Sequence, residues 1–284
     1  MNLRALKKAA AVVLPEAIKR RLRGRLYGFA PPAVDFGLRV ATDAQGVPVA
    51  EAAGLSLRLI PEAVDDVEFH FRGNGDSVEE MHGFLRAARE TGGTLFDVGA
   101  HHGLFAAAFC LARPGNRAVA YEPSPVLRGA GERMLALNGL EDRVRYREAG
   151  VTRAAGTRPA WVDASKGFIS FDPPPPGVQA HDLEMTTLDA ECERLGVFPD
   201  VVKVDVEGHE LEVLRGAREL LARKKPVLFL ELHLDLLEKA GERPAELVEL
   251  LAGHGYRFET SLGRPLRPGA VAGSPMALLR CVAR

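Results

Sequence analysis

The pattern of apolar and polar positions changes character near residue 94. Before that point, apolar residues mostly alternate with polar ones, which is the period of a strand. The clearest alternations are Leu55, Leu57 and Leu59, and Val67, Phe69 and Phe71. From Ser77 to Arg89 the apolar spacing becomes that of a helix, and Gly92 and Gly93 lie just beyond its end. Because strands and helices do not alternate here, we predict that residues 30–92 form an N-terminal accessory or cap region.

From Thr94 onward, short apolar strands alternate with amphipathic helices. Strands are predicted at Thr94–Val98, Ala118–Tyr121, Val144–Arg147, Val201–Val206, Val227–Leu232, Arg257–Thr260 and Met276–Val282. Helices are predicted at Leu104–Ala112, Val126–Leu137, Leu188–Leu195, Glu210–Leu221 and Ala245–His254. This alternation predicts an α/β domain over residues 93–284, with a mostly parallel sheet and helices on both faces. Ligands of such sheets lie outside the carboxyl ends of the strands, so we expect the chemistry in the residues that follow each strand.

An insertion at residues 154–185 interrupts the alternation. It contains Trp161, the sequence Phe-Ile-Ser-Phe at 168–171 and four consecutive prolines at 173–176. Four prolines in a row exclude a helix or an inner strand. We therefore predict a hairpin and a stiff surface loop near the mouth of the site.

Positive charge is concentrated at the N-terminus. The whole chain has a net charge of −1 and only 6% aromatic residues, which argues against a nucleic-acid partner. Residues 1–29 carry eight Lys and Arg residues against the single acid Glu16, and the apolar run Ala9–Leu14 is too short for a signal peptide or a membrane span. We predict a basic amphipathic helix, which either lies on an anionic membrane surface or packs on the domain as a solvated helix.

The cysteines give information about the compartment. Cys110, Cys192 and Cys281 are far apart, odd in number and without Cys-x-x-Cys or metal-binding spacing. This usage fits a reducing, cytoplasmic compartment.

The first predicted strand of the α/β domain leads into a loop that contains two glycines. The strand ends at Asp97, Gly99 and Gly103 follow, and a helix begins directly afterwards. Glycine allows a sharp turn and a close approach of ligand, and the helix start offers free N–H groups. Dinucleotide folds have G-x-G-x-x-G at this place, whereas G-x-x-x-G beside an acid suits a cationic ligand that bears an amino acid. On these residues alone, a tight turn without a ligand stays an alternative.

The second predicted strand also ends in an acid, Glu122, which Pro123 follows. A carboxylate about twenty residues after the glycine loop can accept hydrogen bonds from both ribose hydroxyls of an adenosine. The alternative is an acid that only caps the following helix. Because both strand ends lie at the same edge of the sheet, the pair favours an adenosine-bearing ligand over that alternative.

Charged residues gather around the fourth predicted strand. Lys203, Asp205 and Glu207 share one side of a strand that should otherwise be buried, where charges are rarely unpaired. We predict that Lys203 forms a structural ion pair with Asp205 or Asp97. His209 opens the next helix at the same edge, and histidine is the natural general base near neutral pH. An exposed first-turn residue is the alternative role for His209.

Glu231 and His233 end the next predicted strand and border the same mouth. Several groups around that mouth resemble metal ligands: His101, His102, Asp205, His209, Glu231 and His233. No His-x-x-x-His or similar spacing supports a metal site, so we predict none and expect substrate binding or a structural role.

Six motifs together resemble the FkbM family of methyltransferases. They are Phe-Asp-Val-Gly-Ala…Gly (96–103), Tyr-Glu-Pro (121–123), Leu-Asn-Gly-Leu (137–140), Thr-Leu-Asp (187–189), Val-Lys-Val-Asp-Val-Glu-Gly-His-Glu (202–210) and Leu-Glu-Leu-His (230–233). The resemblance runs from about Thr94 to Leu234, and Lys-x-Asp-x-Glu-Gly-x-Glu is its most specific mark. It implies a class I methyltransferase fold, with seven strands of which the last is antiparallel, and S-adenosylmethionine as cofactor. It also implies O-methylation, typically of sugar or polyketide-type hydroxyls.

The resemblance further implies roles for single residues. Asp97, Gly99, Ala100 and Gly103 would surround the methionine part of the cofactor, Glu122 would hold the ribose, Asn138 and Ala149 would lie towards the adenine, and Asp205 would close the site. The family usually has Ala-Asn after the glycine, whereas this chain has Ala100, His101 and His102. Whether these histidines touch cofactor or substrate stays open.

The predicted reaction is an in-line attack of a substrate hydroxyl on the cofactor's methyl group. We predict that His209 accepts the proton, with Glu207 orienting or replacing it and His233 as the reserve. The acceptor is expected to be a sugar, a glycolipid or a polyketide-like natural product. The alternative is a non-catalytic, cofactor-binding scaffold that the basic segment docks to a membrane or a glycan-assembly complex.

Overall fold

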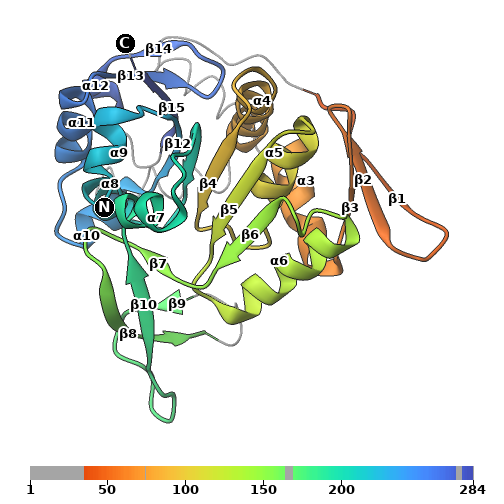
Figure 1. Cartoon of the computed structure of the whole chain (residues 1–284), viewed down its shortest axis with the longest axis horizontal. Helices are drawn as coiled ribbons and strands as arrows, with labels where there is room; N and C mark the ends of the chain where they lie inside the picture. The colour runs from red at the N-terminus through yellow and green to blue at the C-terminus, as the bar shows by residue number, and fades with distance from the viewer. Residues whose placement is uncertain (1–34, 74, 164–168, 273–276, 284) are drawn as a thin grey trace, which may run out of the picture.

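The computed structural model describes residues 35–73, 75–163, 169–272 and 277–283 (Figure 1). The predicted basic helix at residues 1–29 lies outside these ranges. Within the part of the chain described, no helix has the length and apolar character needed to cross a membrane.

The central sheet has the strand order of a class I methyltransferase. Its eight strands lie in the order β14-β13-β15-β12-β11-β4-β5-β6. They are β4 (Thr94–Val98), β5 (Arg117–Tyr121), β6 (Val144–Arg147), β11 (Val201–Val204), β12 (Val227–Leu232), β13 (Tyr256–Thr260), β14 (Pro265–Leu266) and β15 (Ala277–Ala283). Strands β4, β5, β6, β11 and β12 are parallel to one another, and β15 runs antiparallel between β12 and β13. The sequence predicts seven strands, and the eighth is the two-residue edge strand β14, which pairs with β13.

Helices cover both faces of this sheet, as the alternation predicts (Figure 1). One face carries α4 (Gly75–Glu90), α5 (Leu104–Ala112) and α6 (Pro125–Leu137). The other carries α7 (Leu188–Leu195), α8 (Glu210–Arg215), α9 (Arg218–Arg223), α10 (Leu234–Lys239), α11 (Pro244–Gly253) and α12 (Pro268–Ala272). Successive strand residues point to opposite faces, so Leu95 belongs to the first apolar core and Phe96 to the second.

One predicted helix, Glu210–Leu221, is two helices in the structure. The break between α8 and α9 falls at Gly216, where a Cβ would overlap the backbone oxygen of Thr152. The Asp189 carboxylate accepts hydrogen bonds from the backbone N–H groups of Glu219 and Leu220, which begins a new helix. The close approach of a neighbouring loop therefore ends a helix that the apolar spacing alone continues.

The described residues of the N-terminal region form a small sheet, a short 3-10 helix and the helices α3 (Val64–Arg72) and α4. Strands β1 (Arg39–Thr42), β2 (Pro48–Ala52) and β3 (Leu55–Arg58) form an antiparallel sheet, which the 3-10 helix η1 (Pro61–Ala63) and helix α3 follow. The predicted strand at Val67–Phe71 is wrong, because α3 buries Val67 and Phe71, one turn apart, and leaves Phe69 46% exposed. Helices α3 and α4 share an apolar core with α5, so this region is packed against the α/β domain.

The insertion forms a second sheet at the carboxyl edge of the central one (Figure 1). Strand β7 (Gly150–Val151) directly follows β6, and β10 (His181–Thr186) lies between β7 and β8 (Gly156–Val162). The short strand β9 (Ile169–Ser170) pairs with the end of β8. The antiparallel β8–β10 pair is the predicted hairpin, and the prolines lie in its connection.

Candidate active site

The glycine loop is shaped by the close approach of two neighbouring segments. Gly99 and Gly103 both have the left-handed backbone conformation, with φ of 78° and 74°. A Cβ at Gly99 would overlap the backbone oxygen of Asp205, and one at Gly103 would overlap the Tyr146 hydroxyl. The N–H groups of Gly99 and Ala100 donate to the Tyr121 carbonyl, at 3.0 and 3.1 Å. The loop is therefore tied to β5 on one side and pressed against the end of β11 on the other.

Asp97 lies beneath this loop. Its carboxylate is buried and accepts a 3.0 Å hydrogen bond from the backbone N–H of Ala106, in the first turn of α5. Burial raises the pKa of Asp97 to about 7, although the nearby Lys203 ammonium opposes this shift. Through this hydrogen bond, Asp97 links the end of β4, where the glycine loop begins, to the first turn of α5.

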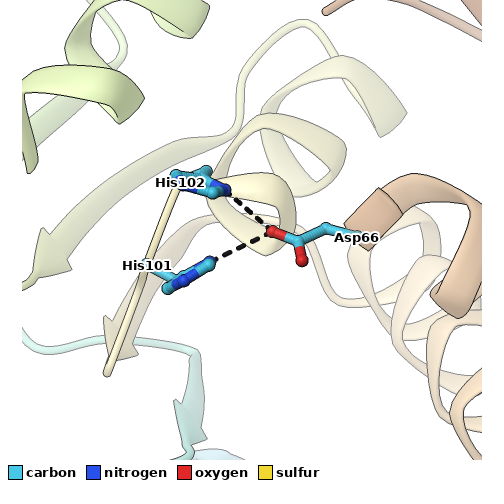
Figure 2. A group of neighbouring side chains, drawn as sticks. All are labelled: Asp66, His101 and His102. Atoms are coloured by element: carbon cyan, nitrogen blue, oxygen red, sulfur yellow. Dashed lines mark hydrogen bonds and ion pairs between the residues drawn. The ribbon is translucent and has the colours of Figure 1, made fainter. Parts of the chain in front are cut away.

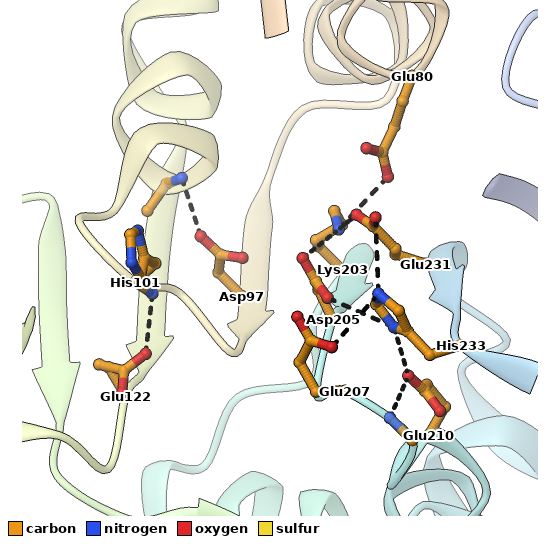
Figure 3. Close-up of polar contacts among 12 residues, drawn as sticks. Glu80, Asp97, His101, Glu122, Lys203, Asp205, Glu207, Glu210, Glu231 and His233 are labelled. Carbon is orange, nitrogen blue, oxygen red and sulfur yellow. Dashed lines mark hydrogen bonds and ion pairs between the residues drawn. The ribbon is translucent and has the colours of Figure 1, made fainter. Parts of the chain in front are cut away.

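Glu122 is held by backbone N–H groups at the end of β5 (Figure 3). One carboxylate oxygen accepts from the N–H of His101, as Figure 3 shows, and the other accepts from the N–H of Ser124, both at 2.9 Å. Burial raises the pKa of Glu122, and these two hydrogen bonds oppose the shift. A carboxylate accepts about four hydrogen bonds, so acceptor positions are left on both oxygens.

The two residues assigned to the adenine side lie in different places. Ala149 is buried beside β6 and β7, at the carboxyl edge of the sheet. Asn138 lies at the far end of α6, and its side-chain amide bonds the backbone N–H and carbonyl of Arg58 and the carbonyl of Met134. The thirteen residues of α6, about 20 Å along the helix axis, lie between it and Glu122, so the geometry gives no support to the prediction that Asn138 lies towards the adenine. It ties α6 to β3.

Lys203 is the centre of a buried group of charges (Figure 3). Its Nζ lies 3.3 Å from a Glu80 oxygen and 3.7 Å from oxygens of both Asp205 and Glu231. Burial disfavours the ammonium, but the surrounding carboxylates outweigh it and raise the pKa of Lys203. The predicted ion pair with Asp205 is present, together with two further partners.

Glu80 comes from α4 and was missed by the sequence analysis. Burial raises its pKa, against the opposing charge of Lys203. One feature of the sequence could have pointed to it: Glu80 lies one turn before Phe84, so its charge falls on the apolar, buried side of α4.

His233, the reserve candidate, is the histidine that lies among the carboxylates. Its Nδ1 lies 3.1 Å from a Glu210 oxygen, and its Nε2 lies 3.6 Å from Glu207 and 3.9 Å from Glu231. Burial lowers the pKa of His233, but the hydrogen bond to Glu210 and the charges of Glu207 and Asp205 prevail and raise it to about 9. Glu207 therefore pairs with His233, which corrects the prediction that it orients His209.

His209 lies apart from that group. Its ring packs against Phe171 of the insertion, with the ring centroids 5.6 Å apart. The guanidinium of Arg158 lies 4.0 Å above the other ring of this pair, that of Phe171. Within the part of the chain that the structure describes, the His209 imidazole makes no hydrogen bond or ion pair.

The two histidines of the glycine loop have a partner in the N-terminal region (Figure 2). The Nδ1 atoms of His101 and His102 lie 3.0 and 2.9 Å from the same oxygen of Asp66, in the first turn of α3. Asp66 was not predicted, because residues 67–71 were interpreted as a strand; the i, i+4 pair Val67 and Phe71 was the overlooked signal of a helix.

Comparison with known proteins places the chain in a family. A family model described as "Methyltransferase FkbM domain" matches residues 97–258, which is more than half of the chain. The hexuronic acid methyltransferase AglP of Haloferax volcanii is 28% identical over 217 residues, covering 72% of this chain and 79% of that protein. The methyltransferase sdnD of Sordaria araneosa is 28% identical over 197 residues, covering 57% of this chain and 73% of that protein.

Solved structures include weaker matches. Methyltransferase FkbM from Methylobacillus flagellatus is 18% identical, with a TM-score of 0.43, covering 66% of this chain and 43% of that one. The O-methyltransferase TomG of Streptomyces achromogenes, in complex with its cofactor, is 14% identical, with a TM-score of 0.46, covering 80% of this chain and 92% of that one. The family match rests on the sequence, and the strand order agrees with it: this chain belongs to the FkbM methyltransferase family and is an S-adenosylmethionine-dependent methyltransferase.

Proposed function

We propose that this enzyme transfers the methyl group of S-adenosylmethionine to a hydroxyl of a sugar, a glycolipid or a polyketide-like natural product. The main observation is the arrangement of the carboxyl edge: Glu122 lies beside the glycine loop at the end of β5, and the Lys203–His233 group lies on β11 and β12, on the far side of β4. This arrangement supports a cofactor on one side of the edge and a proton acceptor on the other. The cofactor supplies an electrophilic methyl group on a sulfonium.

The residues at the cofactor side fit that ligand. The open acceptor positions of Glu122 suit two ribose hydroxyls, and the loop from Gly99 to Gly103 is left to hold the methionine part. Asp205 would close the site from the end of β11, against Gly99. Ala149 would lie towards the adenine. The carboxylates of Glu122 and Asp205 also make the surroundings suitable for a cation.

We assign the proton-accepting role to His233 in place of His209, since Glu207 and Glu210 orient His233. A pKa of about 9 means that His233 is mostly protonated at pH 7 and must lose this proton before it can act. We therefore expect kcat/KM to rise by about tenfold from pH 7 to pH 8 and to level off only above pH 9. A profile that is flat above pH 7 would contradict this role.

Paired substitutions separate the two histidines. His233→Gln is expected to lower kcat by about 100-fold or more, as loss of a general base does, with little change in the affinity for S-adenosylhomocysteine. His209→Gln is expected to keep kcat and to raise KM for an acceptor that contacts the Phe171 side. The opposite pattern, with kcat lost only in His209→Gln, would restore His209 as the proton acceptor.

The nature of the acceptor is supported by one relative. AglP is by name a hexuronic acid methyltransferase, which favours a sugar acceptor for this chain. We would incubate the enzyme with methyl-labelled cofactor and with glycan, glycolipid and hydroxylated natural-product fractions, and then treat the products with mild base. A methyl ether keeps its label, whereas a methyl ester loses it. Label that base removes would show a carboxyl acceptor and overturn the hydroxyl.

The same assay also tests the alternative of a non-catalytic scaffold, against which the family match argues. A scaffold would bind S-adenosylhomocysteine and transfer no label to any fraction. Glu122→Gln serves as the control, because it should weaken cofactor binding and remove any genuine transfer together.

A further inference from the structure

Three potential ligand atoms converge on one point beside the cofactor loop (Figure 2). The Nδ1 atoms of His101 and His102 lie 3.0 and 2.9 Å from one oxygen of Asp66, and the two imidazole rings are 4.0 Å apart. Together these residues bring three ligating atoms within 4.8 Å of one another. They come from two separate elements, the first turn of α3 and the loop before α5.

The backbone is set so that both rings face Asp66. His101 has a φ of 52°, the left-handed conformation that few residues other than glycine adopt. Its N–H simultaneously donates to Glu122, which fixes the peptide on the cofactor side. An unusual conformation held from both sides points to a built arrangement of the two histidines.

The donor set and its spacing suit a first-row transition metal. Two imidazole nitrogens and a carboxylate oxygen form the His-His-carboxylate set that binds divalent metals while leaving positions open. Metal–ligand bonds of about 2.1 Å that meet at a right angle place neighbouring ligand atoms about 3.0 Å apart. Both distances from Asp66 to the histidines match that separation.

The surroundings favour a cation that solvent can reach. His101 and Asp66 have side chains 33% and 32% exposed, whereas His102 is nearly buried and anchors the group. The negative charges of Glu122 and Asp205 both act on His101. One turn along α3 from Asp66, the buried Nδ1 of His70 has no hydrogen-bond partner among the described residues. The Nδ1 atom of His70 is therefore a further nitrogen on this side of the loop to which none of the described groups bonds.

The neighbouring residues Asp205, Glu231 and His233 also bring ligating atoms together, but a lysine already forms ion pairs with their carboxylates. The Lys203 ammonium lies 3.7 Å from both carboxylates. A second cation there would meet that charge, whereas no ammonium or guanidinium contacts Asp66 in the part of the chain described.

We propose that Asp66, His101 and His102 bind one divalent transition-metal ion, which links the N-terminal region to the cofactor loop. No metal site is predicted from the sequence, because the third ligand, Asp66, lies in α3. The apolar residues of this helix alternate with polar ones as they would in a strand. The ion would hold the loop whose His101 N–H positions Glu122.

The test is a titration of the full, chelator-stripped chain with Co²⁺ and Zn²⁺, followed by the visible absorption of bound Co²⁺ and by the metal content after dialysis. We expect one ion per chain. Asp66→Asn keeps the shape of the side chain and should weaken binding by at least about tenfold, because even groups that only support metal ligands contribute that much. His101→Asn should do the same, since asparagine tolerates the left-handed conformation and keeps the N–H to Glu122. Asp65→Asn, an exposed neighbour in the same turn, is the matched control and should bind normally.

Two results would overturn the site: no stoichiometric ion on the wild-type chain, or binding that survives in both variants and disappears in His233→Gln. S-adenosylhomocysteine binding, measured on the same stripped samples, keeps this outcome separate from the proposed function. A stripped chain that binds the cofactor product but no metal refutes the metal site alone. Loss of cofactor binding at intact metal content counts against the proposed function alone.

Discussion

The two sides of the carboxyl edge hold their acidic groups by different means. On the proposed cofactor side, Glu122 and Asp97 are held by backbone N–H groups that lie within 21 residues of them in the chain. On the other side, Asp205 and Glu231 are held through Lys203, which also needs Glu80 from a distant helix. Backbone partners are present whatever the side chains are, whereas side-chain partners depend on one another. Substitution of an acidic side chain on the first side should therefore cost less stability than substitution of Lys203 on the second.

The largest effect is expected from Lys203→Met. It leaves Glu80, Asp205 and Glu231 without their shared cation, and breaking a buried ion pair costs about 3–5 kcal/mol. Urea unfolding measures this loss. The control Lys224→Met breaks an ion pair with Asp200 whose lysine is 41% exposed, and it should cost less than about 1 kcal/mol.

Adding Glu80→Gln to Lys203→Met sharpens this point. The second substitution removes one of the unpaired carboxylates, so the double variant should be more stable than Lys203→Met alone. Equal stability of the two variants would show that Glu80 does not depend on Lys203.

The next largest effect is expected from Gly99→Ala. The new Cβ would combine left-handed strain with an overlap on the Asp205 oxygen, for a loss of about 2–4 kcal/mol in stability and of measurable cofactor binding. Gly139→Ala is the control, because Gly139 has a φ of 61° but no neighbour within 4 Å. It should show only the strain, about 1–2 kcal/mol. Equal losses of stability in the two variants would mean that the backbone of Asp205 does not pack closely against Gly99.

Glu122→Gln should change binding more than stability. The amide keeps the shape but loses the charge, and a hydrogen bond to a charged group contributes about 1.5–3 kcal/mol, or roughly 10- to 150-fold in affinity for S-adenosylhomocysteine. Calorimetric titration measures it. Glu132→Gln, on the exposed face of α6, should bind as the wild type does. An unchanged affinity in Glu122→Gln would remove this residue from the cofactor site.

The smallest effect concerns pH and His233. Its pKa is raised to about 9 in the folded chain, above the ordinary value of 6.5. The stabilisation from its carboxylate partners is therefore fully present below pH 6.5 and is lost as the pH rises through 9. The free energy of unfolding of the wild type should exceed that of His233→Gln by about 1 kcal/mol or more at pH 6, and the gap should narrow by pH 10. A gap that widens with pH would contradict the raised pKa.

The same contrast explains what sequence reasoning reached. The bounds of β4, α5, β6, α7 and β12 are those predicted, because each is a continuous apolar or amphipathic run. In α3, by contrast, the exposed Phe69 stands between the buried Val67 and Phe71, so the sequence shows the alternation of a strand. Only the packing shows which of these three apolar residues are buried.

The candidate site divides in the same way. Glu122 follows a strand directly, so its position is readable from the chain. The proximity of Lys203 to Glu80, and of His101 to Asp66, joins segments that no local pattern connects. His209 was favoured for its place after β11, but the turn at Gly208 and the packing of the insertion direct its ring to Phe171.

The central claim is that Glu122 holds the ribose of S-adenosylmethionine at the end of β5. A crystal structure of the chain with S-adenosylhomocysteine tests it most directly. We expect both ribose hydroxyls within hydrogen-bond distance of the Glu122 carboxylate. The hydrogen bonds that Glu122 accepts from the N–H groups of His101 and Ser124 should persist. A ribose held elsewhere, with Glu122 facing only its backbone partners, would contradict it.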